Sequence, residues 1–359
     1  MVCLMTKDKT IFIKNIYYML SYAFQVLKQS NYEEIASEKF DHAQDLFAAI
    51  LSKGVAQQLK RGLHREYVTK HEGLSVLRGK LDMQGTIRSR IQRKQELTCE
   101  FDELSENNLF NQILKTTLHV LVKDEGVSPD RKAALKKNLV FFDGIDLLEP
   151  SEIAWNRLYY QRNNKNYELL MNICRFVLDG MLQTTDEGEY KMAAFSDAHM
   201  AQLYEKFILE YYRQHHTYLT EVKAAQVKWN LTGDSSDSMI RFLPAMQTDI
   251  FLRLKEKVLI LDAKYYGRTL QEHFDKYTLH SGNMYQIFTY VKNQDKDNTG
   301  NVAGILLYAK TDEAVTPDCM FHIGGNQIGA KTLDLNTDFK VIAAQLDKIA
   351  GDYFRVKTI

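Results

Sequence analysis

The stretch MQTDIFLRLKEKVLILDAKYYG, residues 246–267, decides the fold of its half of the chain because it contains two strand-like runs. Both runs, 247–254 and 257–265, are rich in Ile, Leu, Val and Phe, residues that favour β-strands. Only Lys255 and Glu256 separate them, and a two-residue connection is typical of a tight β-hairpin. We therefore expect two antiparallel strands here, with charged side chains placed among the apolar ones.

The register of this hairpin brings three charged side chains together. Facing residues in a two-residue hairpin have numbers with a constant sum, so Leu254 opposite Lys257 places Asp249 opposite Asp262. Side chains alternate along a strand, and Asp262 and Lys264 therefore project from the same face. Two facing carboxylates, with Cβ atoms about 5 Å apart, repel each other. The register of the hairpin therefore predicts a cluster of two carboxylates and one ammonium group in which the carboxylates repel each other.

A hard divalent cation is the simplest compensation for this repulsion, because carboxylate oxygens suit Mg²⁺. Asp249 and Asp262 would bind the ion, and Lys264 would hold or polarise a water or stabilise charge on a phosphate. Together these groups predict metal-assisted phosphodiester hydrolysis. The alternative is a hairpin whose charges lie on a solvated face. The apolar run VLILDAKYY argues against it, because an unpaired carboxylate is costly in a buried strand.

Two predicted helices add candidate site residues. In helix 283–293, Gln286 and Tyr290 lie one turn apart and could orient Lys264 or touch a DNA backbone. The alternative for this pair is an ordinary polar helix face. In helix 197–213, Glu205 lies at the edge of the apolar face. It would add a third carboxylate ligand for the metal, or else form a surface salt bridge.

The chain as a whole predicts an α+β or α/β protein with two domains. Residues 1–165 form a mainly helical N-terminal domain with short strands in the first part of 73–94, and residues 166–359 form a domain with a central mixed sheet flanked by helices. The boundary is placed at the polar NNKN cluster. The remaining predicted helices are 14–28, 41–63, 106–123, 129–142, 167–183 and 337–350, and the remaining strands are 222–229 and 302–309.

The charge balance limits how this chain would contact nucleic acid. It has 46 basic and 46 acidic side chains among 359 residues, so its formal net charge is zero. Many nucleic-acid-binding proteins are strongly basic overall, so DNA contact here would rely on local patches or on a partner. Two basic clusters are candidates for contact with a partner or with phosphates, and a solvated surface is the alternative for each: Arg78, Lys80, Arg88, Arg90, Arg93 and Lys94, and Lys60, Arg61 and Arg65.

Several classes of protein are unexpected on this sequence. The four cysteines form no C-x-x-C pair, which argues against a structural zinc site and suits a reducing cytoplasm. No stretch approaches about 18 uninterrupted apolar residues, so no membrane span is expected. No G-x-x-x-x-G-K-[ST] loop occurs, so this chain is not expected to bind a nucleoside triphosphate by itself.

The spacing D-x12-D-x-K, followed by Q-x-x-x-Y, resembles the PD-(D/E)xK nuclease superfamily. Segments over nearly the whole chain resemble, in order, the McrC family of modified-cytosine restriction systems: KNIYYMLSYAF, LSKGVAQQLKRGL, GKLDMQGTIR, FDELSENNLFNQILKTTL, LYEKFILEY, MQTDIFLR, LILDAKYY and NMYQIFTY. The resemblance implies catalytic roles for Asp249, Asp262 and Lys264, and a metal ligand in the Ala263 carbonyl. Thr248 departs from the proline of the superfamily pattern, a departure that McrC proteins share.

What the resemblance implies about function is a division of labour between two proteins. McrC-like chains dock on a hexameric AAA+ GTPase, McrB, stimulate its GTP hydrolysis and cut double-stranded DNA that contains modified cytosine. We thus expect Mg²⁺ on this chain and GTP on its partner, with residues 1–165 engaging that partner. Two alternatives remain: a stand-alone repair or recombination nuclease, and a non-catalytic subunit that assembles and activates the GTPase.

Overall fold

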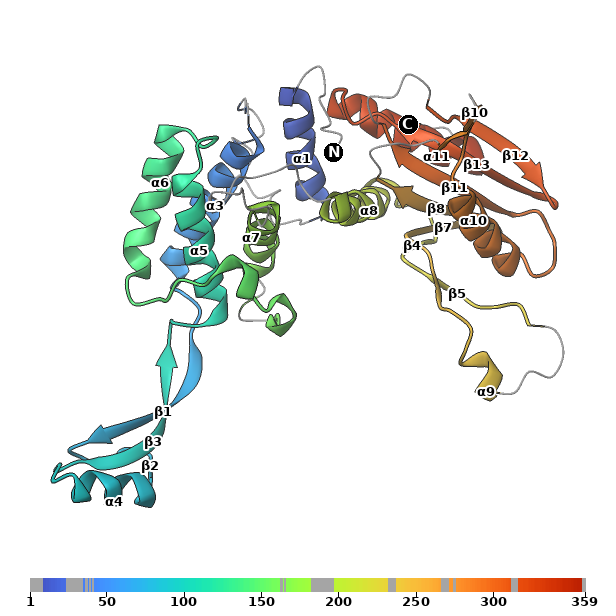
Figure 1. Ribbon diagram of the computed structural model, residues 1–359. Coiled ribbons are helices and arrows are strands. Elements are labelled where there is room, and N and C mark those ends of the chain that lie inside the picture. Colours follow the sequence, from blue (N-terminus) through green and yellow to red (C-terminus); the bar gives the residue numbers. More distant parts are fainter. Residues whose placement is uncertain are drawn as a thin grey trace. The chain divides into compact units, whose positions relative to one another are not determined.

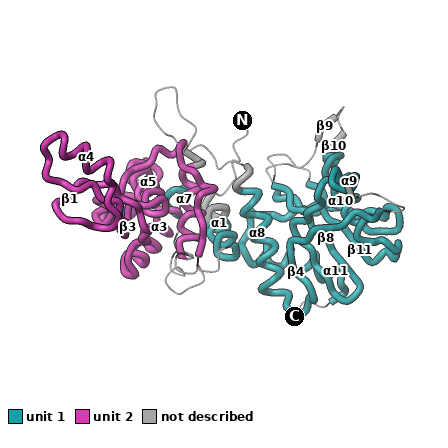
Figure 2. The backbone as a smooth tube through the Cα atoms, turned by 90° about the horizontal axis from the view of Figure 1, so that it is seen from below, with its two compact units in different colours: residues 1–46, 194–359 teal, residues 47–193 magenta. Residues whose placement is uncertain are grey.

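A computed structural model of the chain divides into two compact units, residues 1–46 with 194–359 (unit 1) and residues 47–193 (unit 2), as Figure 2 shows. It combines helices with sheets, as predicted for a mixed α and β protein. The structure describes residues 9–23, 35, 38, 40, 42–161, 164, 166–181, 197–231, 237–265, 271–273, 276–310 and 316–356.

The units do not follow the predicted boundary between residues 165 and 166. Helix α1 (Lys9–Ala23) packs against α8 (Asp197–His215) in unit 1, and its buried Asn15 donates hydrogen bonds to the carbonyls of Leu335 (2.7 Å) and Thr337 (2.8 Å). The predicted linker lies inside unit 2, where the Asn164 side chain is buried and donates to the Tyr159 carbonyl. Long-range packing, which composition does not report, therefore assigns the first helix to the second half of the chain.

Unit 1 is built on a mixed sheet of six strands within the described residues (Figure 1). Strand β11 runs parallel to β8 and β13, and the other neighbours are antiparallel. The spatial order is β12 (Cys319–Ile323), β13 (Asn326–Leu333), β11 (Val302–Ala309), β8 (Lys257–Lys264), β7 (Ile250–Leu254) and β4 (Glu221–Lys223). The β12–β13 hairpin was not predicted.

The hairpin of β7 and β8 has the register that the sequence predicts. Leu254 pairs with Lys257 and Ile250 pairs with Leu261, so the sum of paired numbers is constant along the ladder. Lys255 takes a positive φ of 53°, which lets the two-residue connection follow the twist of the strands. The predicted strand 222–229 is instead two short strands, β4 and β5 (Gln226–Val227), and β5 pairs with β6 (Met246–Gln247).

Helices cover both faces of this sheet. On one face, Phe251, Val258 and Ile260 form a core with α10 (Ser281–Gln294). The alternate residues of β7 and β8 are also buried and point to the opposite face, where α8 and α11 (Phe339–Phe354) pack. Gly304 of β11 allows α10 to lie close, because a Cβ there would be 2.6 Å from side-chain atoms of Ile287 and Val291.

Unit 2 joins a helical body to a projecting sheet (Figure 1). The body contains α3 (Ala43–Arg61), α5 (Leu109–Lys123), α6 (Pro129–Leu139) and α7 (Tyr167–Met181). The projecting arm contains β1 (Glu66–Leu74), β2 (Lys80–Leu81), β3 (Leu97–Ser105) and α4 (Met83–Ile91). Tyr167 ties α7 to α5, since its hydroxyl donates to Asn111 Oδ1 at 2.9 Å.

The arm contains the short strand β2 in the first part of 73–94, where short strands were predicted. Residues 83–91 form helix α4, because Asp82 serves as its N-cap and accepts a hydrogen bond from the Gln84 N–H at 3.0 Å. The long antiparallel pair β1–β3 was not predicted, since β1 is mostly exposed and lacks a continuous apolar face. Within the described residues, we find no helix that is long and apolar enough to cross a membrane.

Candidate active site

Two carboxylates of the hairpin meet at the end of the β7–β8 ladder. Asp249 precedes β7 and Asp262 lies near the end of β8, one step beyond the last paired residues. Asp262 is fully buried, and its Oδ2 contacts Lys264 Nζ at 2.6 Å. Asp249 is partly buried, and its Oδ2 accepts a hydrogen bond of 2.8 Å from the Ala263 N–H. Asp249, Asp262, Ala263 and Lys264 therefore lie together, as the register predicts.

The electrostatics of this pair are strained. Burial raises the pKa of Asp249 to about 7, and the charges of Asp262 and Glu205 add to the rise. Burial also raises the pKa of Asp262, although the Lys264 ammonium acts in the opposite direction. One lysine thus shares the site with the buried carboxylate of Asp262 and the partly buried carboxylate of Asp249, and the second negative charge is left without a cation of its own.

Glu205 comes to the same site from α8. Burial raises its pKa, and the next largest cause is the charge of Asp262. Among the described residues, however, no group of three His, Cys, Asp or Glu side chains is arranged to hold a metal ion. Glu205 is therefore close enough to act electrostatically, whereas the groups nearest to a cation site are the two aspartates of the hairpin.

A chain of hydrogen bonds fixes the lysine. Lys264 Nζ donates to Gln286 Oε1 at 3.2 Å, and Gln286 Nε2 donates to the Tyr290 hydroxyl at 2.9 Å. Both partners belong to α10 and lie one turn apart, so the Q-x-x-x-Y spacing places them on one side of the helix. Tyr290 is buried in the core under α10, and this packing fixes the last member of the hydrogen-bond series.

Comparison with known proteins shows the family of this chain. Residues 6–309 match the family described as McrBC 5-methylcytosine restriction system component. The chain belongs to this family. A curated relative, the type IV methyl-directed restriction enzyme EcoKMcrBC of Escherichia coli K12, is 30% identical over 348 residues, which are 96% of this chain and 98% of the relative.

A solved structure supports the fold of this McrBC family member. The structure is a half-complex from the tetradecameric assembly of Thermococcus gammatolerans McrB AAA+ hexamers with bound McrC. It is similar with a TM-score of 0.54 at 19% identity, and the match covers 97% of this chain and 78% of that one. The expected resemblance to McrC proteins and the mixed α and β fold are thereby confirmed.

In this McrBC family member, Thr248 stands where the PD-(D/E)xK sequence pattern has proline, and it makes hydrogen bonds that proline could not make. Its N–H donates to the Ala225 carbonyl at 2.9 Å, and its hydroxyl bonds both to that carbonyl (3.0 Å) and to the Ala225 N–H (3.1 Å). Proline has no N–H and no hydroxyl, so it could make none of these bonds. Thr248 therefore anchors the strand that carries Asp249, a role that the sequence pattern did not reveal.

The donor set at the carboxylates fits a hard divalent cation. Asp262 Oδ1 is buried and has no hydrogen-bond partner among the described residues, which leaves it available as a ligand. In an antiparallel strand, the N–H and C=O of one residue point to the same side. The Ala263 carbonyl therefore faces the side on which its N–H meets Asp249. Oxygen donors of this kind suit Mg²⁺.

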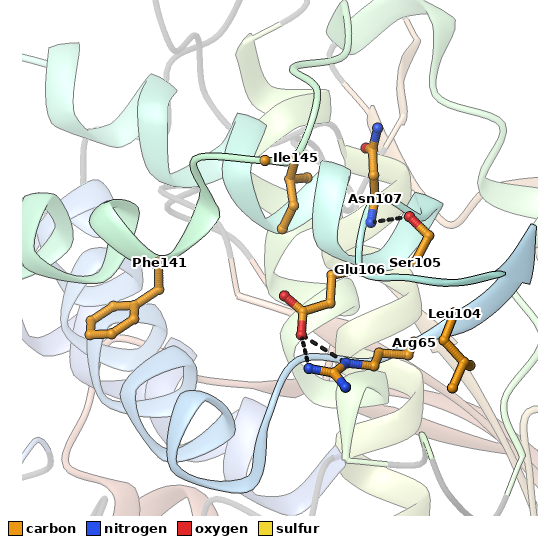
Figure 3. Close-up of a pocket in the computed structure, with 8 residues that line it drawn as sticks. Arg65, Leu104, Ser105, Glu106, Asn107, Phe141 and Ile145 are labelled. Atoms are coloured by element: carbon orange, nitrogen blue, oxygen red, sulfur yellow. Dashed lines mark hydrogen bonds and ion pairs between the residues drawn. The ribbon is translucent and has the colours of Figure 1, made fainter. Parts of the chain in front are cut away.

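The basic clusters of unit 2 are partly neutralised. Arg65 lines a pocket of about 430 Å³, where its guanidinium makes two hydrogen bonds to Glu106 Oε1, at 2.9 and 2.7 Å (Figure 3). Arg78 lies 3.5 Å from Glu103 and covers the Phe101 ring. The cations of the arm that stay exposed without an ion pair in the described residues are Arg88, Arg90, Arg93 and Lys94. Eight exposed large apolar side chains of the arm accompany them: Tyr67, Val68, Val76, Leu77, Met83, Ile87, Ile91 and Leu104.

Proposed function

We propose that this chain is the DNA-cleaving subunit of a GTP-dependent restriction endonuclease directed at modified cytosine. The observation that carries the proposal is the buried pair Asp249–Asp262 beside Lys264 on one hairpin. Two neighbouring carboxylates that repel each other destabilise a fold, so their presence indicates that a bound cation or a reaction requires them. Membership in a 5-methylcytosine restriction family supports phosphodiester hydrolysis as that reaction.

Each residue has a role in this proposal. Asp249, Asp262 and the Ala263 carbonyl would hold Mg²⁺, with Glu205 as a further acid beside them. When bound, the ion supplies Lewis-acid polarisation of the phosphodiester and lowers the pKa of a bound water. The Lys264 ammonium lies beside Asp262, where it would orient the attacking water or bind a phosphate oxygen. Gln286 and Tyr290 keep its ammonium in place.

The proposed partner is a McrB-like AAA+ GTPase hexamer. The solved relative is a complex of McrB AAA+ hexamers with bound McrC. This chain has no P-loop motif, so GTP is proposed to bind to the partner alone. We assign docking to unit 2 instead of residues 1–165, because α1 packs within unit 1. The exposed basic and apolar side chains of the arm suit a protein surface that carries both carboxylates and apolar residues.

Asp262→Ala tests the function directly. The full chain with this change, together with its GTPase partner, Mg²⁺, GTP and methylated duplex DNA, should lose cleavage yet still stimulate GTP hydrolysis. Asp352→Ala on the exposed surface of α11 is the matched control and should cut normally. Cleavage by Asp262→Ala at the wild-type rate would refute the proposed site.

The same assay separates the two alternatives. A stand-alone repair or recombination nuclease would cut DNA with Mg²⁺ and no partner, whereas the proposed subunit cuts little without the motor. A subunit that only activates the GTPase would show no cleavage in the complete wild-type mixture. The zero net charge favours the tethered nuclease, because weak intrinsic affinity for DNA is sufficient once a motor delivers the substrate.

A further inference from the structure

Unit 1 has a basic pocket that the proposed chemistry does not use. Its volume is about 470 Å³, and it lies between β4, β5, β7 and the C-terminal end of α10, elements that Figure 1 shows together at one edge of the sheet. Four cations line it, Lys223, Lys228, Arg253 and Lys296, and none of the lining residues that the structure describes is acidic. The ring of Phe251 lies beneath Lys223 and Arg253, 5.8 and 5.3 Å from their charged groups.

The pocket has an excess of positive charge. Lys223 and Arg253 share one carboxylate, Glu221, which lies 3.0 Å from Arg253 Nε. Lys228 and Lys296 are exposed, and neither has an ion-pair partner in the part of the chain that the structure describes. The nearby Asp295 is turned away, since its carboxylate accepts hydrogen bonds from Thr299, Gly300 and Asn326. The pocket therefore carries a local excess of positive charge, although the net charge of the whole chain is zero.

The pocket lies on the side of the sheet where the carboxylates lie. Val258, Ile260 and Asp262 alternate along β8, and Arg253 and Phe251 pair with Val258 and Ile260, so these side chains project from the same face of the sheet. Four residues of β8 separate Asp262 from Val258, which is about 14 Å at ~3.4 Å per residue. Along α10, Gln286 and Asn293 are about 10 Å apart at ~1.5 Å per residue. The pocket is therefore about 10–14 Å from the proposed cleavage site.

We propose that this pocket binds a phosphate of the DNA backbone, three or four base steps from the phosphodiester that is cut. Successive base pairs rise about 3.4 Å along a duplex, so a separation of about 10–14 Å between the pocket and the cleavage site corresponds to three or four base steps. Unpaired ammonium groups next to a polyanion are the usual source of sequence-independent affinity. The inference rests on the proposed function, and it adds a DNA-positioning site made by Lys228 and Lys296 with Lys223 and Arg253.

An acidic segment of a partner protein is the competing occupant. The position of the pocket favours DNA, because a duplex that reaches Asp249 and Asp262 must pass over neighbouring parts of the same face. The two occupants differ in a measurable way. DNA binding through phosphate contacts weakens with salt in proportion to the number of contacts, by about 0.9 in the slope of log K against log salt for each.

The test measures binding of a fluorescent 30-base-pair duplex to the full chain in EDTA, so that no cleavage occurs. Lys228→Gln with Lys296→Gln should make the slope of log K against log salt shallower by about two. Lys340→Gln with Lys348→Gln, two exposed lysines of α11 on the other side of the sheet, should leave the slope unchanged. Thermal unfolding of both double variants checks that they fold.

Three results would overturn the inference. The first is an unchanged salt slope in the Lys228/Lys296 variant, and the second is no binding of the duplex by the wild type even at low salt. The third is a variant that no longer binds the motor but still binds DNA, which would indicate that the pocket takes an acidic protein segment. The nuclease proposal fails separately. A shallower slope in this variant together with no cleavage by the complete wild-type complex would uphold the pocket and reject the nuclease.

Discussion

Asp249→Asn should stabilise the metal-free protein at pH 8 and abolish its cleavage activity. The folded pKa of Asp249 is raised to about 7, whereas an aspartate in an unfolded chain has a pKa of about 3.9. For an acid with a raised pKa, the stability is fully present below the unfolded pKa and is lost as the pH rises through the folded pKa. Asparagine removes the charge and keeps an oxygen that accepts the Ala263 N–H.

The size of the effect follows from the two pKa values. Their difference of about three pH units corresponds to about 4 kcal/mol at ~1.4 kcal/mol per unit. Asp249 is partly exposed, so solvent screening reduces the gain to about 2 kcal/mol at pH 8. At pH 5 the folded wild-type carboxyl is protonated while the unfolded one is mostly ionised. The expected gain there is about a third of the gain at pH 8.

Urea unfolding in EDTA at pH 5 and pH 8 measures this difference. A Trp155→Phe background leaves Trp229 as the single tryptophan, so that fluorescence reports on unit 1 alone. Asp352→Asn, an exposed aspartate of α11, is the control and should change the midpoint little at either pH. Added Mg²⁺ should raise the midpoint of the wild type more than that of Asp249→Asn, because a ligand stabilises only the state that binds it.

The reasoning would be refuted by a loss of stability in Asp249→Asn at pH 8. That result would mean that the Asp249 carboxylate is a stabilising partner in the fold, as in an ordinary structural ion pair. An equal gain at both pH values would also contradict it, because the proposed cause is a charge that is present at pH 8 and largely absent from the folded state at pH 5.

Three further changes test the structure around the site. Gly304→Ala should cost about 1–3 kcal/mol in urea unfolding and slow cleavage, since the added methyl group pushes α10 from the sheet. Gln286→Leu should slow cleavage by the complete motor complex about tenfold, with an unchanged urea midpoint, because Lys264 loses its positioning partner. Thr248→Pro should lower the stability of unit 1 by about 3 kcal/mol, as its bonds to Ala225 are lost, while Thr248→Ser should keep most of it.

Parts of the site were predictable because their geometry is local. The position of Asp249 and Asp262 at the end of the β7–β8 ladder follows from a two-residue turn, and the alignment of Gln286 with Tyr290 follows from the period of a helix. The arm of unit 2 was not predictable in this way. Strand β1 carries mostly exposed residues, so the alternation that reveals a half-buried strand is missing from it. Its partner β3 buries Cys99 and Phe101 among half-buried residues.

The sequence by itself determined the hairpin, its register and the three charged residues at its end, because each depends on neighbours within about 15 positions. Only the tertiary structure decided that Asp262 is fully buried, that Lys264 meets Gln286, and that α1 belongs to unit 1. It alone also gathered Lys223, Arg253 and Lys296 around one pocket. These facts depend on packing between segments far apart in the chain, and the free energy of such packing is not encoded in any local pattern of residues.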